Sequence, residues 1–175
     1  MPLFAPYEPA AHGARPSVAS SRVATLDDVL GIVEVASSRQ QHPADYAGRV
    51  EAWVRDPERI VVVTDHDGDI AGWAMVAWWS GHDDSPDGYY VSALTVAPGA
   101  RRRGMGDQLL ADVVRRTWTR ASSLHSVINA GNLPSLALHA QHGFVEVRRG
   151  PTFAGITFRG GVGALLRVDA GMAPS

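Results

Sequence analysis

The stretch from Leu94 to Gly106, Leu-Thr-Val-Ala-Pro-Gly-Ala-Arg-Arg-Arg-Gly-Met-Gly, constrains the fold more than any other part of the chain. Its first residues are typical of the end of a strand, Pro98-Gly99 indicates a turn, and the two later glycines open a helical pattern. Backbone N–H groups at a helix N-terminus point outward, and the helix dipole favours negative charge there. The stretch therefore predicts a strand–turn–helix unit whose turn binds an anion.

The residues of this turn favour a diphosphate. Three consecutive arginines, Arg101 to Arg103, offer fork-shaped donors that suit phosphate oxygens. Glycine at positions 104 and 106 lets the backbone approach a bulky anion. Leucine at position 109 breaks the dinucleotide pattern G-x-G-x-x-G, and a chain without lysine has no G-x-x-x-x-G-K-[ST] loop. An arginine run alone is more often part of a solvated surface. The rest of the sequence therefore has to decide between an anion site and such a surface.

Length and composition predict one soluble globular domain. The chain has 175 residues, of which 45% are hydrophobic and 19% are charged. Residues 1–20 are rich in Pro, Ala, Gly and Ser, and we expect a flexible N-terminal arm there. Residues 21–169 would form the single domain, and residues 170–175 a flexible C-terminal tail.

The charge and the cysteine count exclude several classes of function. A net charge of −2 gives no general attraction to nucleic acid or to a membrane surface. No apolar run is long enough to span a bilayer, and no signal peptide is evident, so we expect a cytoplasmic protein. The absence of cysteine excludes disulfides, thiolate metal sites and a cysteine nucleophile, and we expect no metal site.

Hydrophobic periodicity gives the element order β α α β β β α β α β β. Helical patterns cover residues 29–38, 45–55, 104–120 and 132–142. An Asp-Gly turn joins the β-branched run 60–63 to a strand over 70–79, and further strands cover 89–96 and 124–129. A last antiparallel pair follows residue 145. Both faces of the 70–79 strand are apolar, which predicts a central strand in one mixed sheet with helices on its faces.

Two motifs in this order resemble the GCN5-related N-acetyltransferases (GNAT). The acetyl-CoA signature of that family, Q/R-x-x-G-x-G/A after a strand and at a helix start, is matched by Arg101-Arg-Arg-Gly104-Met-Gly106. A second family element, Asn-x-x-Ala/Ser followed by an aromatic position and Gly-Phe, is matched by Asn132-Leu-Pro-Ser135 and Gly143-Phe144. The resemblance covers about Arg22 to Val168. It implies an α+β (α/β mixed) fold with a mostly antiparallel sheet of six to seven strands and about four helices.

The resemblance also implies acetyl-CoA as the acyl-donor co-substrate. Backbone N–H groups and arginine side chains of the turn would hold the CoA diphosphate, and the strand before it would pair with the pantetheine arm as an added strand does. An N–H near Leu94 would polarise the thioester carbonyl. The predicted cofactor-binding residues are Leu94, Thr95, Val96, Arg101, Arg102, Arg103, Gly104, Met105, Gly106, Asn132 and Ser135.

The predicted proton-transfer groups depart from the family pattern. His139 stands where the family usually has a tyrosine acid, and a histidine near its reference pKa of about 6.5 could protonate a thiolate or act as a base. The alternative is a polar helix residue and a thiolate that leaves unassisted. The strand over 89–96 lacks the acid that the family often has there. Asp83 and Asp84 of the preceding acidic loop are therefore candidate bases, acting through water, although a solvated turn would give the same pattern.

The resemblance implies that a primary amine attacks acetyl-CoA directly in a ternary complex. The acidic loop would attract a cation, Trp78 and Trp79 could add cation–π contacts, and Tyr90 could order a water, so these three residues are predicted to bind the substrate. Core packing is the alternative for the tryptophans. Small polyamines, amino-containing antibiotics, amino acids and protein N-termini all remain open as substrates. We expect a monomer or homodimer; the rival hypothesis is a CoA-binding sensor or partner subunit without catalysis.

Overall fold

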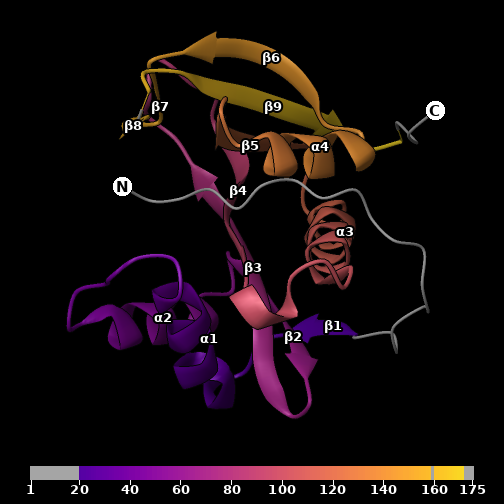
Figure 1. Ribbon diagram of the computed structural model, residues 1–175. Helices are drawn as coiled ribbons and strands as arrows, with labels where there is room; N and C mark the ends of the chain where they lie inside the picture. Colours follow the sequence, from indigo (N-terminus) through magenta and orange to yellow (C-terminus); the bar gives the residue numbers. More distant parts are fainter. Residues whose placement is uncertain (1–19, 159, 172–175) are drawn as a thin grey trace.

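The computed structural model describes residues 20–158 and 160–171 (Figure 1). Most of the predicted N-terminal arm and the end of the predicted tail therefore lie outside the described residues. In chain order the elements are β1 (Ser21–Val23), the 3₁₀ turn η1 (Leu26–Asp28), α1 (Val29–Ser37), α2 (Tyr46–Arg55), β2 (Ile60–His66), β3 (Asp69–Trp79), β4 (Gly88–Val96), the 3₁₀ turn η2 (Pro98–Ala100), α3 (Met105–Thr117), β5 (Ser123–Asn129), α4 (Leu133–Gln141), β6 (Val145–Gly150), β7 (Thr152–Phe153), β8 (Ile156–Thr157) and β9 (Gly163–Asp169).

Seven of these strands form one mixed sheet in the order β1-β2-β3-β4-β5-β9-β6. Every neighbouring pair is antiparallel except β4 and β5, which run parallel. The last strand, β9, inserts between β5 and β6, and β7 and β8 form a separate small hairpin. The predicted fold class, a mixed and mostly antiparallel sheet flanked by helices, is confirmed.

The β2–β3 hairpin lies inside the sheet, between β1 and β4, and the strand predicted over 70–79 is therefore an interior strand. Its turn residues Asp67 and Gly68 have φ angles of 55° and 92°, and two positive φ angles are what a tight hairpin turn requires. On one face, Trp73 and Met75 pack with α1 and α2. On the other face, Ala74 and Val76 pack with α3. The strand is thus covered on both sides, which explains why neither face of its sequence is polar.

The contact of α1 with the sheet is unusually close. A Cβ atom on Gly31 would lie 2.5 Å from Cγ1 of Ile70 in β3, so only glycine fits at this position of the helix. α3 packs on the opposite face against β2, β3 and β4, and α4 packs beside α3. No helix within residues 20–158 or 160–171 is both long and apolar enough to cross a membrane.

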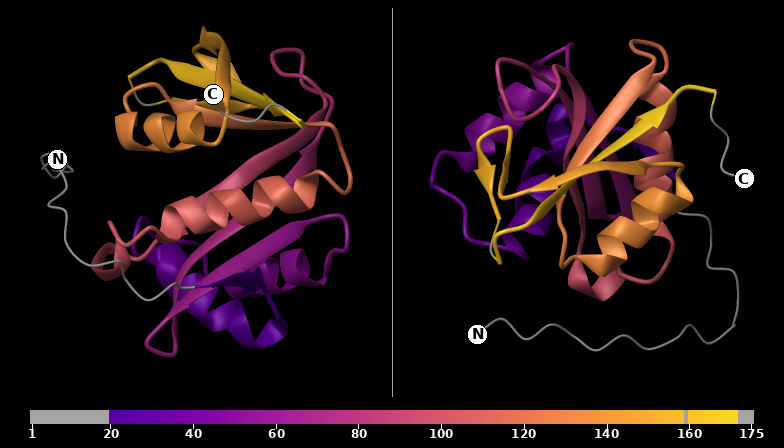
Figure 2. Two further views of the ribbon diagram at one scale, coloured as in Figure 1. Left: turned by 90° about the vertical axis from the view of Figure 1, so that its right-hand side faces the viewer. Right: turned by 90° about the horizontal axis from the view of Figure 1, so that it is seen from above.

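The junction of β4 and β5 interrupts the sheet. Only two residue pairs join these strands, Tyr90 with His125 and Val91 with Ser126. Ser92 lies in a bulge of β4, because Val91 pairs with Val76 of β3 while Ala93 pairs with Met75. Past the bulge the two parallel strands diverge, and the halves of the molecule lie on either side of the gap (Figure 2). The last part of β4 is therefore an internal edge that faces the gap.

Candidate functional site

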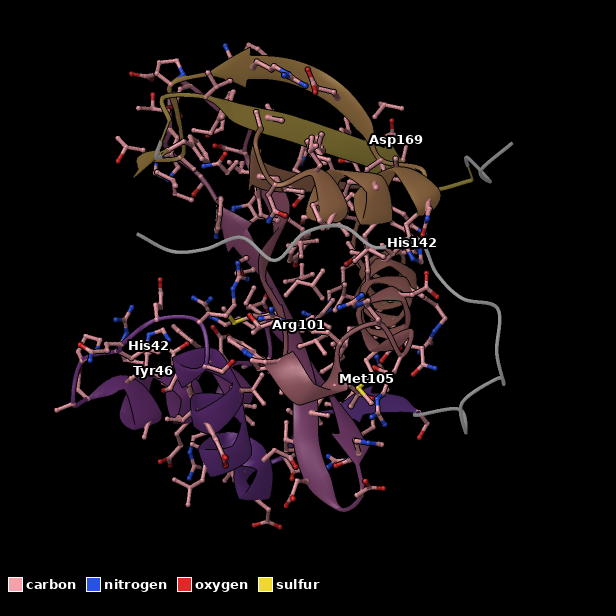
Figure 3. All side chains as sticks on the ribbon, in the orientation of Figure 1. His42, Tyr46, Arg101, Met105, His142 and Asp169 are labelled. Carbon is pink, nitrogen blue, oxygen red and sulfur yellow. The ribbon has the colours of Figure 1, made fainter. Side chains whose placement is uncertain are left out.

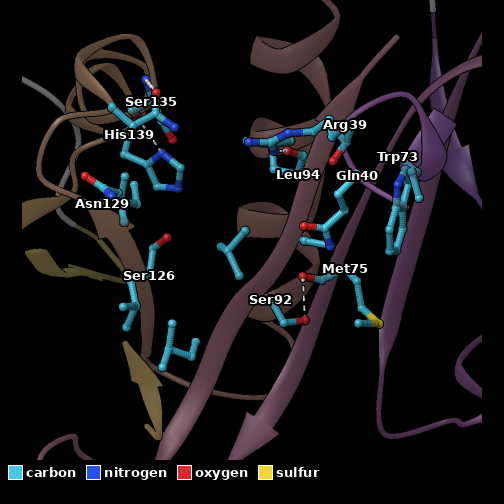
Figure 4. Close-up of a pocket in the computed structure, with 18 of the residues that line it drawn as sticks. Arg39, Gln40, Trp73, Met75, Ser92, Leu94, Ser126, Asn129, Ser135 and His139 are labelled. Carbon is cyan, nitrogen blue, oxygen red and sulfur yellow. Dashed lines mark hydrogen bonds between the residues drawn. The ribbon is translucent and has the colours of Figure 1, made fainter. Parts of the chain in front are cut away.

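A pocket of about 600 Å³ lies where β4 and β5 diverge (Figure 4). One wall comes from the end of α1, the segment after it, α2 and β3; the floor is β4; the other wall comes from β5 and α4. The lining residues are Ala36, Arg39, Gln40, His42, Tyr46, Trp53, Trp73, Met75, Val91, Ser92, Ala93, Leu94, Thr95, Ser126, Val127, Ile128, Asn129, Asn132, Ser135, His139 and Ile156.

The backbone of β4 presents hydrogen-bonding groups to the gap. Ala97 N–H donates to the Ala71 carbonyl of the segment beside it at 2.8 Å, and alternation along the strand turns the groups of Val96 and Leu94 the other way. Their carbonyls accept hydrogen bonds from arginine side chains instead: Leu94 from Arg39 at 3.4 Å and Val96 from Arg101 at 3.3 Å. Of the three predicted β4 residues, Leu94 and Thr95 line the pocket, whereas the side chain of Val96 packs against the core.

The N-terminus of α3 has no side-chain cap. Gly104 is the N-cap residue with a φ angle of 78°, a conformation that favours glycine, and a Cβ atom there would meet nothing within 4 Å. Met105 is buried, while Arg101 to Arg103 are exposed. Figure 3 labels Arg101 and Met105 beside this turn. Arg103 lies 2.8 Å from the Nε2 atom of His66. The first-turn N–H groups of this helix thus have no side-chain partner at the cap, and the predicted binding of an anion there stays a prediction.

Asn132 and Ser135 shape the start of α4. The Asn132 side-chain oxygen accepts a hydrogen bond from the Ser135 N–H at 3.3 Å, so it caps the helix. Both residues line the pocket together with His139, one helical turn further on. This cap gives the Asn-x-x-Ser pattern a local structural cause, and it fixes the helix that carries His139.

His139 is the most perturbed group in the pocket. Its side chain is 2% exposed, and burial lowers its pKa to about 4. Nδ1 lies 2.8 Å from the carbonyl oxygen of Ser135, which can only accept, so Nδ1 carries the hydrogen. Nε2 is buried and has no hydrogen-bond partner among the described residues. The neutral ring therefore presents a bare acceptor to the pocket (Figure 4).

The acidic loop lies outside the pocket lining. The Asp84 carboxylate accepts hydrogen bonds from Ala154 N–H at 2.8 Å and from the Ser85 hydroxyl at 3.1 Å, and its backbone carbonyl accepts one from Arg148. The Ala154 hydrogen bond is the main cause that lowers the pKa of Asp84. Asp83 is exposed. This placement does not support the predicted role of either acid as a base, and Asp84 instead ties the loop to the β7–β8 turn.

The three predicted substrate-binding aromatic residues do not line the pocket either. Trp78 is 53% exposed and contacts Tyr89 edge-on. Trp79 stacks on Tyr90 with ring centroids 4.5 Å apart, and the fully buried Tyr90 donates its hydroxyl hydrogen to the Pro86 carbonyl at 2.7 Å. Packing and loop anchoring account for the contacts of these residues, so the placement favours the structural alternative.

The wall formed by the first half of the chain was not predicted from the sequence. Arg39, His42, Tyr46, Trp53 and Trp73 line this wall. The rings of His42 and Tyr46 stack at 3.7 Å, Tyr46 meets Trp53 edge-on at 5.7 Å, and Trp53 stacks on Trp73 at 6.3 Å. These residues form no motif, because the fold gathers them from α2, β3 and the connection between α1 and α2. Within the described residues, no cluster of three or more His, Asp or Glu side chains is arranged to hold a metal ion.

Solved structures share this fold. The protein yncA from Salmonella typhimurium, solved with its cofactor acetyl-CoA, has a TM-score of 0.73 at 18% identity and covers 91% of this chain and 98% of its own. A GNAT superfamily phosphinothricin acetyltransferase from Sinorhizobium meliloti, in complex with acetyl-CoA, has a TM-score of 0.68 at 21% identity. The match covers 90% of this chain and 93% of that chain. A ribosomal-protein-alanine N-acetyltransferase from Brucella melitensis has a TM-score of 0.68 at 23% identity, and the match covers 85% of this chain and 98% of that chain.

At such identities these likenesses establish the fold alone. No curated protein matches the chain in sequence. The model of the acetyltransferase (GNAT) family, in contrast, matches residues 27–144, which include β4, α3 and α4. Because this match spans more than half of a chain that also has the corresponding fold, the protein belongs to the acetyltransferase (GNAT) family.

Proposed function

We propose that this protein is an acetyl-CoA-dependent N-acetyltransferase that acetylates a primary amine by direct attack within a ternary complex. One observation carries the proposal: the unpaired inner edge of β4 leads, through one short turn, into the uncapped N-terminus of α3. An extended amide-containing arm fits the first feature and a diphosphate fits the second. The two together suit a CoA thioester better than either a nucleotide or a peptide.

Residues on β4 and α3 would share the work of binding acetyl-CoA. Backbone groups of Leu94 and Val96 would pair with the pantetheine arm, replacing the arginine contacts that their carbonyls now have. The first-turn N–H groups after Gly104 would hold the diphosphate, and the exposed arginines would add charge. Acetyl-CoA supplies an acetyl group already activated as a thioester, so the protein contributes binding, orientation and proton transfer.

The absence of cysteine supports direct attack. The chain has no cysteine that could carry the acetyl group as a thioester on the protein. The amine nitrogen would form the bond to the acetyl carbon while the carbon–sulfur bond breaks, and the electron pair would leave on sulfur as a thiolate. One amine proton must depart in the process, and the bare Nε2 atom of His139 can accept it.

The state of His139 favours an acceptor over the predicted acid. With a pKa of about 4, only about one ring in a thousand is protonated near pH 7. The neutral ring has its hydrogen on Nδ1, where Ser135 holds it, so Nε2 has none to give to a thiolate. A buried acceptor of this kind orients the amine by a hydrogen bond and removes its proton after the new bond has raised its acidity. We therefore propose the acceptor role for His139.

Two measurements test this function. Calorimetry should detect 1:1 binding of acetyl-CoA, and absence of binding would overturn the proposal. Release of free thiol should then depend on both acetyl-CoA and an added amine. Binding without thiol release for any amine would favour the sensor hypothesis over the enzyme. The variant Arg120→Gln, which changes an exposed arginine outside the pocket, is a matched control for the loss of charge in turn variants.

His139 needs its own variants. We expect His139→Gln to lower turnover by about 100-fold, because positioned proton transfer contributes about 10²–10⁴ to a rate. His139→Tyr should not restore the wild-type rate, because a neutral phenol oxygen accepts a proton far less readily than an imidazole nitrogen does. Wild-type turnover in both variants would remove His139 from the mechanism.

A further inference from the structure

The pocket lining has an asymmetric charge. Among the described residues that line it there is one arginine, Arg39, and no aspartate or glutamate. Arg39 forms no ion pair with any described residue, and its one hydrogen bond is the long 3.4 Å contact to the Leu94 carbonyl. An arginine at a pocket wall without a carboxylate partner attracts anions and disfavours a second cation nearby.

A second donor on the same wall is unsatisfied. Trp73 is 3% exposed and lines the pocket, yet its indole Nε1–H has no acceptor among the described residues. An indole can only donate, and leaving a buried donor unpaired is unfavourable. Such a group points to an acceptor that arrives with a ligand. Arg39 and Trp73 are thus both donors that suit a ligand with a negatively charged oxygen.

The opposite wall has the reverse requirement. His139 enters from α4 and presents the bare acceptor Nε2, while Arg39 enters from the segment after α1 (Figure 4). A ligand that fits both walls must accept hydrogen bonds at one end and donate them at the other. A molecule with a carboxylate next to an amino group has this arrangement.

We propose that the acceptor substrate is an amino acid whose carboxylate binds Arg39 and the indole N–H of Trp73 while its amino group faces His139. The inference rests on the proposed acetyltransferase function and names its substrate class. Met75 and the rings of Tyr46 and Trp53 line the same side of the pocket, so an apolar or aromatic side chain suits the site better than a charged one. Polyamines and aminoglycoside-like amines carry further cations, for which the lining offers no carboxylate.

Matched amines test the carboxylate directly. Phenylalanine, phenylalaninamide and phenethylamine share one ring and one primary amine, and differ in whether a carboxylate, a neutral amide or a hydrogen stands next to it. Leucine with leucinamide, and spermidine, complete the panel. We expect the wild-type protein to use the amino acids at least about tenfold better in kcat/KM than their amides, with spermidine the poorest. Equal use of acids and amides, or a preference for spermidine, would overturn the inference.

Variants locate the effect. Arg39→Gln should lower kcat/KM for the amino acids about 10- to 100-fold through KM and leave the amides nearly unchanged, because a charge-assisted hydrogen bond is lost only in the first case. Arg39→Lys should retain part of the preference. Trp73→Phe keeps an aromatic ring but removes the N–H together with part of the indole, so it should reduce the preference several-fold. Arg120→Gln should leave it intact. An unchanged preference in Arg39→Gln would show that Arg39 does not read the carboxylate.

Failure of the substrate class is distinct from failure of the function. If amides or polyamines are acetylated and amino acids are not, the enzyme function stands and the inference falls. If acetyl-CoA binds and no amine is acetylated, calorimetry of the CoA-bound protein with phenylalanine and phenylalaninamide decides the inference without turnover. Tighter binding of the acid, lost in Arg39→Gln, would support the subsite, and equal or no binding of the two would overturn it.

Discussion

Lowering the pH from 7 to 5 should destabilise this protein through the buried ring of His139. In the folded state burial lowers the pKa of His139 to about 4, while the unfolded chain has the ordinary value of 6.5. Above pH 6.5 the ring is neutral in both states and the pH has no effect through it. As the pH falls through 6.5 the unfolded chain gains a proton that the folded protein does not, so the free energy of unfolding decreases until about pH 4.

The size of this effect follows from the two pKa values. At pH 5 this histidine is almost fully protonated in the unfolded chain, whereas only about one tenth of the folded molecules carry the proton. The free energy of unfolding is therefore lower at pH 5 than at pH 7 by about 2 kcal/mol. For a domain of this size, that corresponds to a fall in Tm of about 4–8 °C. The effect is large enough to measure and small enough to leave the protein folded.

Urea unfolding of the wild type and of His139→Gln at both pH values is the assay. Burial also lowers the pKa of His125, which adds to the pH dependence in the same direction, so the wild type alone is not sufficient. The variant keeps a polar side chain and does not titrate. We expect its loss of stability between pH 7 and 5 to be smaller than that of the wild type by about 2 kcal/mol. The same pH dependence in both proteins would refute the reasoning, because His139 would then titrate alike in the two states.

Three further predictions concern other parts of the molecule. Gly104→Ala places a side chain at a φ angle of 78° in otherwise open space, so calorimetry should show acetyl-CoA affinity about tenfold lower in a protein that still folds. Asp28→Asn removes an ion pair whose two hydrogen bonds to Arg22 are 2.7 and 2.8 Å long, and urea unfolding should show a loss of about 1–3 kcal/mol. Asp84→Ala should keep kcat/KM within about twofold, while hydrogen exchange at the Ala154 amide becomes faster; a large loss of activity would return Asp84 to the mechanism.

Local patterns in the sequence predict most of the fold. The Asp67-Gly68 turn, the central strand after it and the helix that begins at Met105 all depend on residues close together in the chain, and all three are present. The bulge at Ser92 and the divergence of β4 and β5 could not be predicted in this way. Both depend on how separate strands pair, β3 with β4 for the bulge and β4 with β5 for the divergence, and such pairing leaves no periodic signal in either strand.

The residues of the candidate site likewise fall into two groups, those in contiguous motifs and those that only the fold brings together. The turn before α3 and the cap of α4 are contiguous motifs, so the sequence alone could place Gly104, Asn132 and Ser135 at the starts of two helices. The wall that contains Arg39 and Trp73 is assembled from separate elements on the far side of β4, and no motif marks it. The acidic loop was predicted to hold the general base because the strand after it has no acid. In the structure the Asp84 carboxylate instead accepts a hydrogen bond from the β7–β8 turn.

The short junction between β4 and β5 has a consequence for how this protein can change. Apart from Ile156, the pocket is lined by residues 36–75 on the proposed acceptor side and by residues 91–139 on the β4, β5 and α4 side. Because the second stretch contains the groups that we assign to the donor and to proton transfer, substitutions in the first can alter which amine is accepted while the reaction itself is preserved. New acceptors can therefore be explored, by evolution or by an engineer, within about forty residues of sequence.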